Sequence, residues 1–201
     1  MIDWDIPEVH AFIVDWIISN TCNESSPLRP VSLYGVTKLQ AEKLVLSHKN
    51  SVCFRLATVF GYSYRMRTDL IVNNFVQKAV NENKLDIFEP HFRRNFVHIS
   101  DVVKAIIFAI KNFNSLKKGK IYNLGLSTAN LTKLQLAKKI NKYIPIKIYV
   151  DTKTKDPDKR DYFVSNKKIE KKGFKAKIDI DKGIEELIEV YKSHKDFINN
   201  Y

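Results

Sequence analysis

The chain has 201 residues, of which 44% are hydrophobic and 28% charged, which is enough for one domain with a sizeable core. Its composition excludes a disordered or low-complexity chain, and it has no apolar run long enough to span a bilayer. The formal net charge of +12 admits nucleic acid as a partner, but the lysines are spread thinly over expected helix faces, which favours solubility instead.

Helical and β-branched segments alternate through the first half of the chain. Residues 30–47 predict a helix with a proline near its start, and 51–58 (SVCFRLAT) predict a buried strand. A second helix is expected over 69–81. Two short strands, DIF and NFVHI, follow it.

The second half continues the alternation. Residues 101–112 predict an apolar helix whose start is expected to be capped and braced by His98 and Asp101. The remaining predicted elements are a strand at 120–125, a helix at 131–144 capped by Thr132, a strand at 146–150, a charged loop at 151–161, and helical stretches near 165–172 and 181–192. This order favours an α/β domain with parallel strand pairing.

Tyr34 and Lys38 stand four residues apart in the first predicted helix. That spacing places both side chains on one helix face, so they can point into one cleft. A phenol, with a pKa of about 10, is a poor base at neutral pH, and a neighbouring ammonium favours its ionised form. The pair suits proton transfer coupled to hydride transfer at a hydroxyl carbon, although ordinary amphipathic helices also show this spacing.

Several further stretches surround this pair. NESSPLRPVSLYG leads into Tyr34, and FRLATVFG, RRNFVHISDVVKAI, IYNLG and DPDKRDYFVSNKKIEKKGF follow it. In this order, over roughly residues 23–189, they resemble the nucleotide-sugar epimerases and dehydratases of the extended short-chain dehydrogenase/reductase family. The resemblance implies an α/β fold: the C-terminal strands of a partial Rossmann-type parallel sheet, with a small α/β substrate-binding lobe.

The resemblance also implies roles by position. It implies NAD as the cofactor, Tyr34 as the catalytic acid/base, and Lys38 as the residue that holds the nicotinamide ribose, so that both contact the cofactor. Thr58 occupies the place where many relatives have an asparagine that contacts substrate. No metal is implied.

The diphosphate of a nucleoside-diphosphate sugar has its own expected ligands. Asn73 or Asn74, at the start of the second helix, resembles the family's diphosphate-binding position. Arg94 and Arg160 resemble the arginines that clamp the diphosphate, and a guanidinium fork suits phosphate, although both could be surface charges. We expect the two arginines to converge on one pocket, and alanine at either position to weaken binding while leaving folding nearly unchanged.

The N-terminal region departs from the family pattern. The family begins with a glycine-rich strand–turn–helix that cradles the cofactor pyrophosphate, and none of the six glycines here falls in such an array. The family also has a hydroxyl about two dozen residues before the tyrosine, and in VHAFIVDWIISN none stands at that place, since Ser19 and Thr21 are too close to Tyr34. We leave residues 1–22 unassigned and interpret 23–201 as the C-terminal part of the epimerase/dehydratase domain with its substrate lobe.

The sequence thus predicts an NAD-dependent epimerase or dehydratase of a nucleoside-diphosphate sugar, in a truncated form. We expect the isolated chain to be inactive and to bind NAD weakly. The alternatives are half of an enzyme split over two chains, or a non-catalytic nucleotide-sugar-binding module or subunit that needs a partner. The expected partners are a second copy or a complementing N-terminal half, with no nucleic acid or membrane. Cys22 and Cys53 show neither disulfide nor metal spacing, which predicts a cytoplasmic setting.

Overall fold

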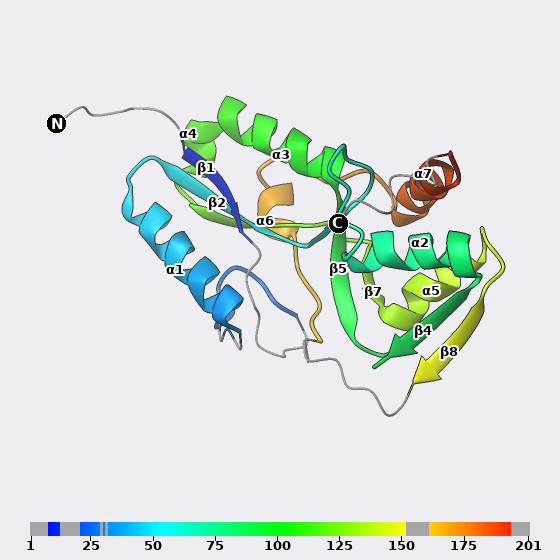
Figure 1. The fold of residues 1–201 in the computed structure, drawn as a ribbon. Helices are drawn as coiled ribbons and strands as arrows, with labels where there is room; N and C mark the ends of the chain where they lie inside the picture. The colour runs from blue at the N-terminus through cyan, green and yellow to red at the C-terminus, as the bar shows by residue number, and fades with distance from the viewer. Residues whose placement is uncertain (1–7, 13–20, 29, 31, 152–160, 194–201) are drawn as a thin grey trace.

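Helices cover both faces of a short parallel β-sheet, and a second group of strands and helices packs beside it (Figure 1). The computed structural model describes residues 8–12, 21–28, 30, 32–151 and 161–193. In chain order the elements are β1 (Glu8–Phe12), α1 (Leu33–Ser47), β2 (Ser51–Leu56), β3 (Thr58–Phe60), α2 (Ile71–Glu82), β4 (Lys84–Phe88), β5 (Arg93–His98), α3 (Ile99–Lys111), α4 (Phe113–Leu116), β6 (Ile121–Leu124), β7 (Asn130–Thr132), α5 (Lys133–Asn141), β8 (Lys147–Asp151), α6 (Lys167–Glu170) and α7 (Ile180–Ser193).

The central sheet has the strand order β1–β2–β6, and all of its pairings are parallel. Val9 stands opposite Val52, and Cys53 stands opposite Ile121. α1 lies on one face of the sheet and α3 on the other (Figure 1). Parallel neighbours need crossover connections, and these helices supply them. The predicted α/β fold with parallel pairing is confirmed.

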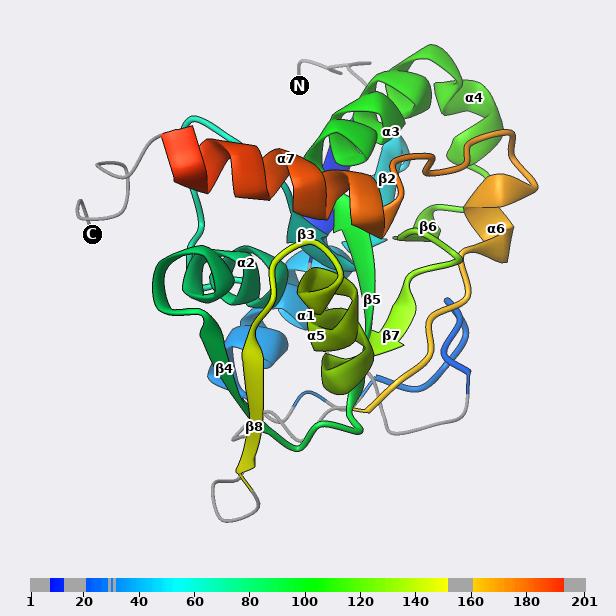
Figure 2. The same ribbon diagram turned by 90° about the vertical axis from the view of Figure 1, so that its right-hand side faces the viewer.

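A second lobe contains two further strand groups, β3–β5–β7 and β4–β8. α2, α5 and α7 contact one another in this lobe, with α7 lying above the other two in Figure 2. Its buried side chains include Phe75, Leu85, Ile87, Leu136 and Ile184. The lobe therefore has an apolar core that joins the lobe's helices to β4.

The predicted strand over 51–58 proves to be two strands. β2 ends at Leu56, and the Ala57 N–H still donates to the Leu124 carbonyl of β6 at 2.8 Å. From Thr58 onward the chain pairs with β5 instead. The run has no break in its apolar pattern, so periodicity does not reveal the change of sheet. Thr58 consequently stands at the junction of the central sheet and the lobe.

The helix caps follow the sequence with one exception. His98 Nδ1 accepts a backbone N–H at 3.3 Å at the start of α3, and Thr132 opens α5 with a full capping box, as predicted. Asp101 instead accepts the N–H groups of Lys177 and Ile178, at 2.8 and 2.7 Å. Asp101 lies in the first turn of α3 and does not cap the helix, but the prediction that it braces the helix is confirmed. Its buried carboxylate ties α3 to the segment before α7.

One edge of the central sheet is open among the described residues, where β1 pairs with β2 alone. α3 contacts β1, and about half of each side chain in the stripe Val103, Ile107 and Ile110 is exposed. These positions share one helix face. An open parallel edge and an apolar helix stripe therefore lie close together.

Candidate active site

Tyr34 and Lys38 lie in the first two turns of α1. Ser32 caps the helix by accepting the Gly35 N–H at 3.0 Å, so the helix begins slightly later than the predicted residue 30. The Lys38 Nζ lies 5.2 Å from the centroid of the Tyr34 ring. The two side chains therefore share one helix face, as their spacing predicts. The Tyr34 side chain remains accessible, with 51% of its surface exposed.

A buried ion pair fixes α1 on the sheet. The Glu42 carboxylate receives two hydrogen bonds from Arg55 of β2, Nε to Oε2 at 2.8 Å and Nη2 to Oε1 at 2.7 Å. Arg55 Nη1 also donates to the Glu24 carbonyl at 3.1 Å, and the Glu24 carboxylate accepts the Asn123 N–H at 2.8 Å. The bidentate geometry sets the position of α1, and hence of Tyr34, relative to β2 and β6.

A cavity of about 670 Å³ opens beside Tyr34, next to the carboxyl ends of β2 and β4. Ligands of open α/β sheets bind at such ends. The cavity is lined by Tyr34, Leu56, Thr58, Val59, Arg67, Asp69, Leu70, Ile71, Asn74, Phe75, Asp86, Ile87, Phe88, Arg94, Lys133 and Tyr162. It combines apolar and aromatic walls with a few polar groups, as small-molecule sites usually do.

Four residues singled out from the sequence, Tyr34, Thr58, Asn74 and Arg94, line this cavity. Lys38 is not part of the wall, but its ammonium lies beside the Tyr34 ring. Arg160 lies outside the described residues, so its convergence with Arg94 stays a prediction.

Asn73 and Asn74 differ although they are neighbours. Asn73 is buried, with Oδ1 accepting the Gly61 N–H and Nδ2 donating to the Arg67 carbonyl, both at 3.1 Å. It holds the loop before α2 in place, and Gly61 there has a φ of +110°, which glycine adopts readily. Asn74 faces the cavity and donates to the Thr68 carbonyl at 3.2 Å. Of the two candidate ligands, the structure brings only Asn74 to the cavity.

Arg94 is a buried cation of the cavity wall, with 6% of its surface exposed. Its Nη1 donates to the Arg93 carbonyl at 2.9 Å, and its Cζ lies 5.4 Å from the centroid of the Tyr162 ring. A stacked, hydrogen-bonded guanidinium is held ready for a planar or anionic ligand. The expectation that Arg94→Ala leaves folding nearly unchanged assumed an exposed side chain, and the burial of Arg94 overturns that assumption.

Lys133 and the Arg67–Asp69 pair are wall residues that the sequence analysis missed. Arg67 binds Asp69 through Nε–Oδ1 and Nη2–Oδ2 contacts of 2.7 and 2.6 Å, and these hydrogen bonds lower the pKa of Asp69. Lys133 is buried at the first position of α5. In a chain with 34 lysines and arginines, neither shows a local pattern that distinguishes it from surface charge.

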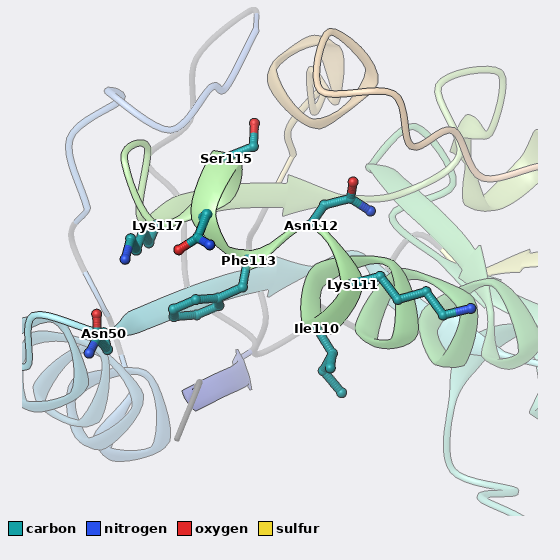
Figure 3. A pocket seen from close by; sticks show the side chains of 8 residues that line it. Asn50, Ile110, Lys111, Asn112, Phe113, Ser115 and Lys117 are labelled. Carbon is teal, nitrogen blue, oxygen red and sulfur yellow. The ribbon is translucent and has the colours of Figure 1, made fainter. Parts of the chain in front are cut away.

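A second hollow, of about 510 Å³, lies at the amino ends of β2 and β6 (Figure 3). Lys111 and Lys117 belong to its lining, and Figure 3 shows them extending in different directions on either side of Phe113. The cavity beside Tyr34 is therefore the better candidate for the active site, since it combines the Tyr–Lys helix with buried polar groups.

Residues 17–125 match the family model described as the NAD dependent epimerase/dehydratase family. The chain belongs to this family. A dTDP-D-glucose 4,6-dehydratase of Mus musculus is 30% identical over 187 residues, which are 86% of this chain and 51% of the relative. A UDP-glucose 4-epimerase of Lactobacillus helveticus is 27% identical over 139 residues, covering 58% of this chain and 42% of the relative. This family member thus spans about half the length of the curated relatives it matches, or less.

Solved structures of the same kind share its fold. The dTDP-glucose 4,6-dehydratase of Bacillus anthracis in complex with NAD superposes with a TM-score of 0.77 at 17% identity, over 95% of this chain and 63% of that one. The UDP-glucose 4-epimerase of Thermotoga maritima with UDP-glucose gives 0.76 at 18% identity, over 94% and 64%. These likenesses confirm the Rossmann-like architecture.

The family is NAD-dependent, and the chain fits that cofactor in part. Tyr34 and Lys38 present a phenol and an ammonium side by side on α1. Its pyrophosphate needs a glycine-rich strand–turn–helix, and the 201-residue sequence has no such array. Within the described part of the chain, no helix could span a membrane and no cluster of His, Cys, Asp or Glu could hold a metal ion.

Proposed function

We propose that the cavity beside Tyr34 binds a nucleoside-diphosphate sugar, and that this chain is the substrate-binding half of an NAD-dependent epimerase or dehydratase. One observation carries the proposal: the Tyr34 side chain of the Tyr–Lys helix and the buried guanidinium of Arg94 line the same cavity. The first is suited to proton exchange with a sugar hydroxyl and the second to the diphosphate, so one ligand can engage both.

Each residue then has a defined task. The Tyr34 phenolic oxygen takes a proton from a sugar hydroxyl and returns it, and the Lys38 ammonium stabilises the ionised phenol. Arg94 binds the diphosphate, with Thr58 and Asn74 as neighbouring polar contacts and Arg160 as a predicted second clamp. NAD, when bound, supplies the hydride acceptor and donor of this family's chemistry.

The second candidate is a non-catalytic nucleotide-sugar-binding subunit, or half of a split enzyme, that requires a complementing polypeptide. The open edge of β1 and the exposed stripe of α3 favour it, because a further parallel strand with its crossover helix would cover both. A complementing N-terminal half that carries the glycine-rich turn fits this surface better than a second copy, which lacks such a turn. The thiols of Cys22 and Cys53 are buried and form no disulfide, which suits the expected reducing cytoplasm.

Calorimetric titration of the isolated chain tests the proposal. We expect saturable binding of UDP-glucose or dTDP-glucose, very weak binding of NAD, and no epimerase or dehydratase turnover. Failure to bind either nucleotide sugar would contradict the substrate site. Tight stoichiometric binding of NAD would contradict the need for a complementing polypeptide.

A further inference from the structure

The loop between β3 and α2, residues 61–70, forms one wall of the cavity. Arg67, Asp69 and Leu70 of this loop line the cavity together with Tyr34. The pKa of Arg67 is raised chiefly by its hydrogen bond with Asp69 and by the charge of that carboxylate, and the Tyr34 phenol is near enough to contribute as well. The loop wall therefore lies at the Tyr34 end of the cavity, where the proposed function places the sugar.

Side chains from two helices hold the ends of this loop. At its start, the Tyr62 N–H donates to Glu186 Oε1 of α7 at 2.9 Å, although 124 residues separate the two in sequence. At its end, the asparagines of α2 hold the Arg67 and Thr68 carbonyls. Between these anchors the chain reaches the surface, where 95% of the Tyr64 side chain is exposed. The position of the loop wall therefore depends on the side chains that hold its ends.

His98 in turn fixes the Glu186 carboxylate. Its Nδ1 accepts the Ser100 N–H at 3.3 Å, so a neutral ring carries its proton on Nε2. This Nε2 lies 3.1 Å from Glu186 Oε2. The ring is buried, and a Cβ added at Gly61 would lie 2.4 Å from Nε2, so close packing against the start of the loop fixes the ring's orientation. The two oxygens of Glu186 therefore have separate partners.

A carboxylate is the group that fits both of these contacts. One oxygen accepts a backbone N–H and the other faces the protonated nitrogen of an imidazole, so both positions require an acceptor. Glutamine would present an N–H donor at one of them, and alanine would present no polar group at either. Glu186 is not part of the cavity wall, so any effect it has on a ligand passes through the loop.

We propose that Glu186 is a positioning residue for the sugar end of the site. By holding Tyr62 it sets the place of the loop wall, and through that wall it raises the affinity for a nucleoside-diphosphate sugar relative to the nucleoside diphosphate alone. The inference rests on the proposed function and adds to it a residue of α7 that acts on one part of the ligand. The diphosphate is assigned to Arg94 of β5, outside the loop, so its binding should not depend on Glu186.

The test compares the affinities of UDP-glucose and UDP for the parent chain, Glu186→Ala, Glu186→Gln and Glu189→Ala. The same comparison with dTDP-glucose and dTDP covers a preference for the other base. Glu189 is exposed on the same helix and serves as the matched control. Loss of the hydrogen bond that anchors the loop predicts that Glu186→Ala weakens UDP-glucose by about 3- to 10-fold and UDP by no more than about twofold. Glu186→Gln keeps an oxygen for the Tyr62 N–H and should recover part of the loss, whereas Glu189→Ala changes neither affinity.

The outcomes separate the two proposals. If the parent chain binds the nucleotide sugar and Glu186→Ala binds it equally well, Glu186 does not position the site, and the inference is overturned while the proposed function stands. An equal or larger loss of affinity for the nucleoside diphosphate shows that Glu186 only supports the fold, which also overturns the inference. A parent chain that binds neither nucleotide sugar overturns both proposals.

A measurement on the parent chain covers the case in which Glu186→Ala does not fold. Coupling between two sites is reciprocal, so a loop anchor that favours the sugar must itself be stabilised by the sugar. In a sample with ¹⁵N-labelled tyrosine, the Tyr62 amide, assigned by its absence in Tyr62→Phe, should exchange its proton with solvent about 3- to 10-fold more slowly at saturating UDP-glucose than at saturating UDP. Equal exchange rates in the two complexes would overturn the inference.

Discussion

The two hollows of this molecule contain the same kinds of charged residue in opposite settings. In the cavity at the carboxyl ends of the strands, Arg94 and Lys133 are buried and hydrogen-bonded to carbonyls. In the hollow at the amino ends, Lys111 is exposed, and the Lys117 ammonium lies 5.9 Å from the Phe113 ring on the surface helix α4. Basic residues alone therefore do not mark a site. Burial and a fixed geometry at the carboxyl ends of strands distinguish the two.

The largest expected effect concerns the stability contributed by the ion pair that holds α1, the helix carrying Tyr34, on the sheet. Glu42→Ala leaves Arg55 buried without its carboxylate, which should cost about 3–5 kcal/mol of unfolding free energy. Urea denaturation of the purified chain measures it. The control is Asp69→Ala, which breaks an exposed pair and should cost at most about 1 kcal/mol. Similar losses of unfolding free energy in both variants would show that the buried pair contributes no more than the exposed one.

Substitutions in the two hollows should differ in their effect on UDP-glucose affinity, and Arg94→Ala tests this. We expect it to weaken binding of UDP-glucose by about 1.5–3 kcal/mol, the cost of charged hydrogen bonds, while Lys111→Ala leaves binding unchanged. Because Arg94 is buried and stacked on Tyr162, the variant should also be less stable, so calorimetry is done well below its melting temperature. Equal affinities of Arg94→Ala and Lys111→Ala for UDP-glucose would contradict the distinction between the two hollows.

The pH dependence of stability should be traceable to the ion pair of Arg93 and Asp161, whose chain neighbours Arg94 and Tyr162 line the carboxyl-end cavity. Arg93 donates to Asp161 through Nε at 3.0 Å and through its backbone N–H at 2.8 Å, and these hydrogen bonds, chiefly that of the side chain, lower the pKa of Asp161. The pair therefore stabilises the fold above the unfolded-state pKa of about 4, and this contribution is lost as the pH falls through the lower folded-state value.

The pair is partly exposed, so the effect is limited to about 1 kcal/mol or less. Asp161→Asn should lower the urea midpoint at pH 7, and this difference should shrink as the pH is lowered toward 3. A difference that persists undiminished at pH 3 would show that the charge of Asp161 contributes nothing.

The smallest expected effect belongs to the amino-end hollow. The double variant Lys111→Gln/Lys117→Gln should change the free energy of unfolding by no more than about 0.5 kcal/mol, as surface substitutions usually do. Its affinity for UDP-glucose should equal that of the parent chain. A clear loss of affinity would mean that this hollow takes part in binding after all.

The sequence by itself determined what depends on near neighbours along the chain. The i, i+4 spacing places Tyr34 and Lys38 on one helix face, and the capping box at Thr132 starts α5 where predicted. The alternation of periodicities indicated the α/β class, and the ordered motifs indicated the family. These features need only local geometry or a short pattern, which the residues carry directly.

Only the tertiary structure decided what depends on pairing between distant segments. The register of β5 and β7 brings Lys133 to the wall that holds Arg94, and the change of sheet at Ala57 places Thr58 at the junction. The rotation of α2 turns Asn74 toward the cavity and leaves Asn73 buried against the loop. Which of two adjacent residues faces a cavity, and which lysine among many is buried, follows from packing that no local pattern encodes.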